Sequence, residues 1–263
     1  MAKIAAQLYT VRQFTQTIQD FAETCRKVKE MGYDGVQLSA IGPLDSKDVK
    51  KVLDDNGLAC PATHFSLDSM ENEFGAFVEK HHLWGCQYPA IGGFFPTPIA
   101  DFDLAHWQAF VQRFNAIAKR LAAEGLILGY HNHSHEFARI DGNLVPFQLL
   151  FNELDPASTW FEIDTYWVAA GGAEPTDWIR KVAHRIPCIH FKDMTIHLDD
   201  DPAKNRTPEM AEIGDGNLNW PGIVEACRYA GVQWYIVERD RGPVEAFASL
   251  ARSIQNMRNR MGL

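Results

Sequence analysis

The chain has 263 residues, of which 46% are hydrophobic and 22% are charged, as expected for a globular domain with a sizeable core. Its formal net charge is −9 at pH 7, whereas proteins that bind nucleic acids or anionic membrane surfaces normally present a basic face. We therefore expect no nucleic-acid partner and no membrane partner. The sequence shows neither a membrane-spanning apolar run nor a signal-peptide pattern, which predicts a cytoplasmic protein.

Short apolar runs alternate with longer helical patterns along the whole chain. Eight runs have the composition and length of strands that are buried on both faces; they cover residues 4–8, 35–38, 59–64, 87–91, 126–131, 160–164, 187–191 and 234–238. Between them, apolar residues recur at spacings of three and four, as on the buried face of a helix. The clearest of these stripes runs through residues 104–121.

Strands that alternate with helices indicate parallel β-α-β units. Eight such units in 263 residues favour a closed (β/α)8 barrel, or TIM barrel, as one α/β domain over residues 1–263. A doubly wound open sheet would need a glycine-rich turn after the first strand, and residues 7–12 contain no glycine. The longest interruption of the pattern, at about residues 197–217, is predicted to be a long loop that closes over the substrate.

Ionisable side chains gather at the predicted carboxyl ends of the last four strands, where barrel enzymes carry their catalytic residues. They are His131 and His133, Asp164, His190, and Glu238. Buried together without a counter-charge, these carboxylates and imidazoles would be strongly destabilising. We therefore predict one divalent ion, Mn²⁺, Co²⁺, Mg²⁺ or Zn²⁺. Its ligands would be Asp164, His190, Glu238 and one histidine of the fifth strand, for which we favour His131 over His133.

Further side chains are placed to contact a substrate or to take part in proton transfer. Lys192 shares the inward face of its strand with His190, where its ammonium group either binds an oxyanion or pairs with a neighbouring carboxylate. Glu136 either holds a substrate hydroxyl and acts as a base, or is a solvated loop acid. The remaining substrate-binding candidates are two polar strand residues, two aromatic residues and two residues of the predicted lid: Gln37, His64, Tyr9, Trp167, Arg206 and Glu212.

These motifs, in this order, resemble the xylose isomerase-like TIM barrel superfamily, the sugar phosphate isomerase/epimerase group. The resemblance covers essentially the whole chain and is most specific at residues 7–12, 130–136, 164–172, 190–193, 212–221 and 236–238. It implies a metal ion bound by residues of strands five to eight, which chelates adjacent substrate oxygens and acidifies the C–H bond between them. Ketose epimerases of this superfamily use a glutamate on strand five, where this chain has histidine. Histidine-rich fifth strands are closer to the inosose dehydratase and keto-sugar eliminating branches.

We expect a metal-dependent sugar isomerase or epimerase that acts through an enediolate on a small keto-sugar or polyol-derived substrate. The base candidates are Glu238, Glu136 and His133, in that order, and Lys192 would stabilise the enediolate. The alternative is a dehydratase or lyase that uses the same intermediate, either inosose dehydratase-like or acting by β-elimination on a keto-glycoside.

Two further classes fit the sequence less well. A metal-dependent endonuclease on this fold would need more ligands and a basic face, and a non-catalytic sugar-binding barrel would be expected to lose metal ligands. Barrels of this kind often associate through their outer helices, so a homo-oligomer is compatible with the sequence, although no segment marks an interface.

Overall fold

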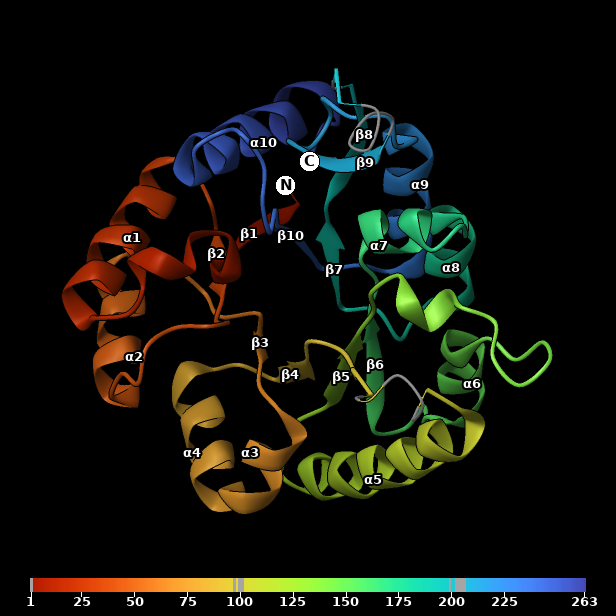
Figure 1. Cartoon of the computed structure of the whole chain (residues 1–263). Helices are drawn as coiled ribbons and strands as arrows, with labels where there is room; N and C mark the ends of the chain where they lie inside the picture. Colours follow the sequence, from red (N-terminus) through yellow and green to blue (C-terminus); the bar gives the residue numbers. More distant parts are fainter. Residues whose placement is uncertain (1, 97, 99–101, 199, 202–206) are drawn as a thin grey trace.

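A computed structural model describes residues 2–96, 98, 102–198, 200–201 and 207–263. Its centre is a ring of parallel strands enclosed by helices (Figure 1). The ring strands are β1 (Lys3–Gln7), β2 (Gly35–Gln37), β3 (Ala62–His64), β4 (Tyr88–Ile91), β5 (Leu128–His131), β6 (Thr159–Glu162), β7 (Cys188–Phe191) and β10 (Trp234–Val237). Each falls within or next to a predicted run, so the eight predicted strands are confirmed.

The strands pair into two four-stranded sheets, in the orders β2-β1-β10-β7 and β3-β4-β5-β6. Isolated parallel bridges join the sheets: Gly35 pairs with Ala59 between the second and third strands, and Asp164 pairs with His190 between the sixth and seventh. The described strands therefore close into a barrel, as predicted.

Helices connect the strands and cover the outside of the ring (Figure 1). They are η1 (Leu8–Phe14), α1 (Ile18–Glu30), α2 (Ser46–Asp55), α3 (Leu67–Asn72), α4 (Phe74–Trp84), α5 (Leu104–Ala123), η3 (His135–Phe137), α6 (Pro146–Glu153), α7 (Thr165–Ala170), α8 (Pro175–Lys181), α9 (Trp220–Ala230) and α10 (Ala246–Arg260). The predicted stripe is the buried face of α5, whose N-terminus is capped by the Asp103 side chain. In the described part of the chain, no helix combines the length and apolarity that a membrane crossing requires.

Side chains alternate along each strand between the barrel interior and the helix-facing core. A small separate cluster of apolar side chains fills the interior: Ala5, Ala62, Ala90, Trp160, Cys188 and Ile236. Two residues further along five of the same strands, the inward positions are polar: Gln7, His64, Glu162, His190 and Glu238. An apolar lower layer therefore supports a polar upper layer at the carboxyl end of the barrel.

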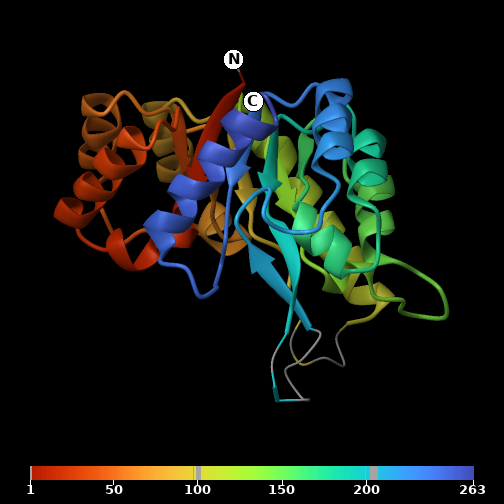
Figure 2. The same cartoon turned by 90° about the horizontal axis from the view of Figure 1, so that it is seen from above.

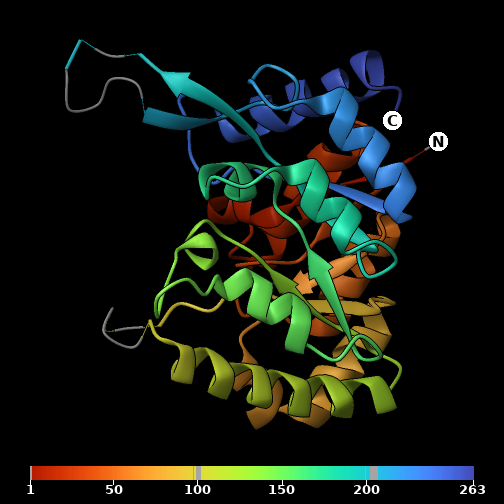
Figure 3. The ribbon, with the colours of Figure 1, turned by 90° about the vertical axis from the view of Figure 1, so that its right-hand side faces the viewer.

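The predicted long loop between β7 and α9 contains a β-hairpin. Strands β8 (Asp193–His197) and β9 (Thr207–Ala211) pair antiparallel, with His197 opposite Thr207. The hairpin projects from the end of the barrel opposite to the two chain termini (Figures 2 and 3). No tight-turn dipeptide joins the two strands, which is why no hairpin signal was recognised.

A buried aspartate anchors the root of this hairpin. The Asp193 carboxylate accepts hydrogen bonds from the backbone amides of Met194 at 2.8 Å, Gly214 at 2.8 Å and Gly216 at 3.0 Å. The Trp220 indole N–H donates to the same carboxylate at 2.6 Å. One side chain at the start of β8 therefore ties both ends of the hairpin to the start of α9.

Candidate metal centre and active site

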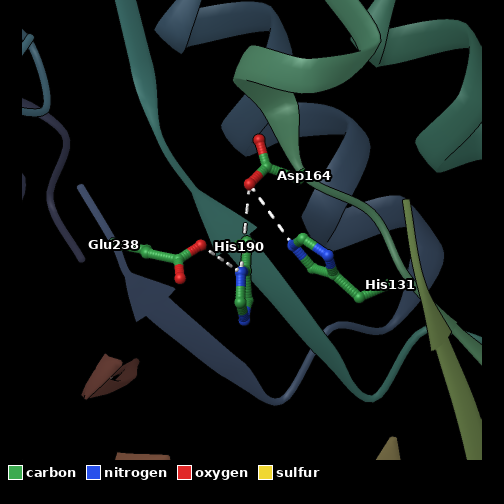
Figure 4. A group of neighbouring side chains, drawn as sticks. All are labelled: His131, Asp164, His190 and Glu238. Atoms are coloured by element: carbon green, nitrogen blue, oxygen red, sulfur yellow. Dashed lines mark hydrogen bonds and ion pairs between the residues drawn. The ribbon is translucent and has the colours of Figure 1, made fainter. Parts of the chain in front are cut away.

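The four predicted metal ligands come together at the carboxyl end of the barrel. His131, Asp164, His190 and Glu238 each offer one ligand atom, and these atoms all lie within 4.8 Å of one another. Figure 4 shows the four side chains converging from neighbouring strands. His190 Nδ1 lies 3.0 Å from Glu238 Oε2, and His131 Nε2 lies 3.4 Å from Asp164 Oδ2. All four residues are buried.

Buried atoms without hydrogen-bond partners point to a cation at this group. Among the described residues, neither ring nitrogen of the buried His131 has such a partner. Leaving a buried polar atom unpaired costs roughly 1–3 kcal/mol. A divalent ion satisfies nitrogen and oxygen ligands of this kind together, so the residues present fit a metal ion. His131, rather than His133, is the fifth-strand histidine in the group.

A lysine ammonium group lies beside the same carboxylates. Lys192 Nζ is 2.7 Å from Glu238, 3.0 Å from Asp164 and 2.9 Å from Asp240. Although burial opposes it, these three carboxylates raise the pKa of Lys192 above its usual range. The ion pair, one of the two alternatives drawn from the sequence, is therefore present. Lys192 also lines the cavity above the metal group, and binding of an oxyanion there stays a prediction.

The orientation of His190 is fixed from behind by Gln37 and Glu162. Its Nε2 lies 2.6 Å from Gln37 Oε1 and 3.2 Å from Glu162 Oε2, and its Nδ1 faces Glu238. Because the Gln37 amide NH2 donates to Glu162 Oε1 at 2.9 Å, its oxygen is the atom that accepts from His190 Nε2–H. This arrangement leaves Nδ1 as the nitrogen for a metal ion. Gln37, predicted to bind substrate, is fully buried behind the ligands instead.

Glu162 is a site residue that the sequence reasoning missed. It precedes Asp164 by two residues and therefore faces the same way, and it is fully buried. Besides Gln37, it accepts a hydrogen bond from His64 Nε2 at 2.5 Å. Burial alone would raise the pKa of Glu162, but the His190 and His64 imidazoles hold it below its usual range. The spacing of two from Asp164 was the signal that could have found it.

A cavity of about 280 Å³ opens above the metal group. Five predicted site residues besides the metal ligand His131 line it: Tyr9, His64, His133, Lys192 and Glu238. Four residues that were not predicted also line it, namely Ser39, Gly92, Phe95 and Asp240. His133 Nδ1 is buried there without a hydrogen-bond partner in the described chain. Burial lowers the pKa of His133 to about 2, so its imidazole is neutral near pH 7.

Glu136 is not brought to this cavity. Its carboxylate accepts hydrogen bonds from the Tyr130 hydroxyl at 2.9 Å and from the His133 backbone amide at 2.8 Å. The Tyr130 ring packs against Phe110 of α5, on the helix-facing side of the barrel. Burial raises the pKa of Glu136 to about 8. This position, turned toward the outer core, does not support the predicted role as a base.

The remaining predicted residues lie at the edge of the site or away from it. Trp167 is half-buried, with its ring centroid 5.1 Å from that of His133 and 5.4 Å from Lys192 Nζ. Glu212 forms a buried ion pair with Arg239 at 2.5 Å and does not line the cavity. Arg206 lies outside the described residues.

The fold and this site define a (β/α)8 barrel whose buried histidine and carboxylate side chains could hold a metal ion. The model of the xylose isomerase-like TIM barrel family matches residues 25–260. The chain therefore belongs to that family, and the resemblance noted in the sequence is confirmed.

Relatives of known sequence or structure cover nearly the whole chain. An inosose dehydratase of Geobacillus thermodenitrificans is 24% identical over 272 aligned residues, which cover 92% of this chain and 90% of that protein. A crystal structure of a sugar phosphate isomerase/epimerase from Parabacteroides distasonis is 23% identical and superposes with a TM-score of 0.79, covering 98% of this chain and 94% of the other. A xylose isomerase-like TIM barrel protein from Mycobacterium smegmatis, in complex with magnesium, is 14% identical with a TM-score of 0.70, covering 98% and 95%.

Proposed function

We propose that this chain is a metal-dependent lyase that acts on a keto-sugar or a related cyclic polyol ketone. The observation that carries this proposal is the buried group of His131, Asp164, His190 and Glu238, with the Lys192 ammonium 2.7 Å from Glu238. The isomerase or epimerase expected first from the sequence would begin in the same way, with removal of a proton next to a carbonyl. The two reactions differ in the fate of the resulting anion, which either expels a leaving group or takes a proton back on carbon.

A divalent ion held by the four-residue group would supply Lewis-acid polarisation of the substrate carbonyl. Lys192 lines the cavity, and its ammonium group can donate a hydrogen bond to the oxyanion that develops as the proton leaves. Gln37 and Glu162 keep His190 in one tautomer and one orientation. The chain's own residues thus prepare the site for an anionic intermediate.

His133 is the base that we favour, ahead of Glu238. His133 lines the cavity, and its Nδ1 has no hydrogen-bond partner in the described chain. Burial holds the pKa of His133 low, so this lone pair would accept a proton only from a C–H group that a bound divalent ion would acidify. Glu238 is engaged by His190 at 3.0 Å and by Lys192 at 2.7 Å. Asp240 and Lys192 also line the cavity and can return a proton to a leaving oxygen.

Elimination is favoured over epimerisation by the distribution of carboxylates around the cavity. Inverting a carbon with two bases requires one on each face of the substrate. The carboxylates that line the cavity in the described chain, Glu238 and Asp240, both follow β10, while β5 brings histidines. The similarity to an inosose dehydratase supports the same choice. Epimerisation remains the second candidate, because His133 and Glu238 enter the cavity from different strands.

The test is incubation of the metal-loaded protein with inosose and a panel of keto-sugars in D2O, followed by NMR and mass spectrometry. Loss of water or of an alcohol from a substrate supports the lyase. Deuterium at a carbon next to the carbonyl, without loss of mass from elimination, would replace the lyase with the epimerase or isomerase. The matched control is His190→Ala, which we expect to be folded and inactive.

A further inference from the structure

A second cavity, of about 390 Å³, adjoins the candidate active site. His64, Gly92 and Phe95 line both cavities. The second cavity lies between the loop that leads from β3 into α3, the loop that follows β4, and the face of α5 that carries Phe110 and Arg113. A substrate seated above the metal group therefore has space to continue sideways into this region.

Aromatic rings form the walls of the second cavity, and polar side chains form its rim. We call it the aromatic groove, defined by the wall residues Phe65, Phe94, Phe95 and Phe110 and the rim residues Ser66, Asp68 and Arg113. Phe95, at the boundary with the active site, is 57% exposed. Since a large exposed apolar ring often marks a binding surface, its position at this boundary points to a ligand that crosses it.

Two glycines keep the boundary between the cavities open. A Cβ atom on Gly92 would lie 3.5 Å from His64 Nδ1, and one on Gly93 would lie 3.0 Å from His133 Nδ1. Gly93 also has a φ of +117°, a conformation that other residues rarely adopt. Side chains at these positions would narrow the passage from the metal group to the groove.

We propose that the aromatic groove binds a second sugar ring, joined through oxygen to the carbon at which elimination occurs. This proposal rests on the lyase function proposed above and names its leaving group. Phenyl side chains offer apolar contacts to the C–H bonds of a pyranose ring, while the Ser66 hydroxyl and the Asp68 carboxylate at the rim suit its hydroxyl groups. The active-site cavity of about 280 Å³ lies below the typical range of roughly 300–1,000 Å³ for drug-sized ligands, so a two-ring substrate needs the groove as well.

The reaction balances without any further reactant. The base takes a proton from the carbon next to the carbonyl, and the electron pair forms a carbon–carbon double bond. The bond from the neighbouring carbon to the bridging oxygen breaks, and that oxygen takes a proton. The products are an unsaturated ketone above the metal group and a free sugar in the aromatic groove.

The experiment measures binding of unreactive sugars to the metal-loaded protein by saturation-transfer NMR. The probes are methyl β-glucoside, which has one ring, cellobiose, which has two, and phenyl β-glucoside. We expect both rings of cellobiose to receive saturation from the protein. Phe65→Leu, which removes one aromatic wall but keeps an apolar side chain, is expected to weaken cellobiose binding by about 2- to 10-fold, the value of one ring contact. Methyl β-glucoside binding is expected to change less than cellobiose binding.

The control variant is Tyr229→Leu, which removes an exposed aromatic ring on α9, across the barrel from the groove (Figure 1). Circular dichroism establishes that both variants fold. If only one ring of cellobiose contacts the protein and Phe65→Leu binds it normally, the groove proposal is refuted while the lyase proposal stands. If no sugar binds, both are refuted. Tighter binding of phenyl β-glucoside than of cellobiose, lost in Phe65→Leu, would refute the sugar ring in favour of an aromatic leaving group.

Discussion

Glu162→Gln tests whether the network behind His190 controls metal binding. The wild-type carboxylate accepts from His64 at 2.5 Å and from Gln37 at 2.9 Å, and lies 3.2 Å from His190 Nε2. The substitution keeps the shape of the side chain but replaces one acceptor oxygen with an NH2 group. That NH2 group must face either the imidazole N–H groups of His64 and His190 or the amide NH2 of Gln37. In either case two hydrogen-bond donors point at each other, and at least one hydrogen bond of the wild type is lost.

A compensating flip of Gln37 would not repair the variant. It would turn the Gln37 NH2 toward His190 Nε2, so that this nitrogen would have to accept a hydrogen bond. The imidazole proton would then sit on Nδ1, the nitrogen that faces Glu238 at 3.0 Å and the metal group. Loss of such a partner behind a metal ligand typically weakens metal binding by roughly 10- to 100-fold, which corresponds to about 1.4–2.8 kcal/mol.

The assay is calorimetric titration of the chelator-treated protein with Mn²⁺, so the readout is the dissociation constant and does not depend on knowing the substrate. Glu136→Gln is the matched control: it removes another buried carboxylate of the same barrel, one that does not line the cavity. We expect its Mn²⁺ affinity to stay close to that of the wild type. Equal affinity of Glu162→Gln and the wild type would show that the network does not orient His190.

Three further predictions concern single buried side chains. Lys192→Met removes the ammonium group beside Glu238 and is expected to lower kcat by roughly 10²- to 10³-fold without weakening Mn²⁺ binding; unchanged turnover would contradict its role. Burial lowers the pKa of His81 from 6.5 to about 3, so the unfolded state takes up the proton first as the pH falls. The contribution of the neutral, buried His81 to the free energy of unfolding is complete above pH 6.5 and declines by about 1.4 kcal/mol per pH unit toward pH 3. Urea unfolding at pH 7 and pH 5 measures this decline, and the His81→Gln variant should lack it. Asp193→Asn turns an amide NH2 toward the N–H donors at the hairpin root, costing about 1–3 kcal/mol, and limited proteolysis is expected to cut near the hairpin faster than in the wild type.

The metal group could be predicted because each of its residues lies at a recognisable strand end. Asp164 and Glu238 close apolar runs, and His190 lies within one, so the carboxyl ends of parallel strands bring them to one place. Glu162 precedes Asp164 by two residues and therefore faces the same way along the strand. It was overlooked because it lies inside an apolar run and not at its end. Its role depends on contacts with Gln37 and His64, which come from strands about a hundred residues away in the chain.

The role expected for Glu136 came from its place in the chain and not from the direction of its side chain. Glu136 ends a run from residue 131 to residue 136 that contains three histidines, and that place predicts a base or a ligand for a substrate hydroxyl. The chain leaves the strand after His131, and the short helix η3 (His135–Phe137) turns the Glu136 carboxylate back onto the Tyr130 hydroxyl. Glu136 therefore lies on the side of Tyr130, the face that strand alternation places away from His131 and His133.

The charges of the upper layer indicate that a metal ion would serve catalysis rather than folding. Without a metal ion, Asp164, Glu162 and Glu238 are buried there beside two cationic groups, the Lys192 ammonium and the His190 imidazolium. The neighbouring Glu162 and Glu238 carboxylates raise the pKa of His190 to about 10 in spite of its burial. The lower layer is apolar and complete without any ion. Folding and metal binding are therefore separable, in contrast to small domains that fold only with their metal. We expect chelation to abolish activity while the circular dichroism spectrum and cooperative unfolding persist, and loss of the folded spectrum on chelation would refute this division between the two layers.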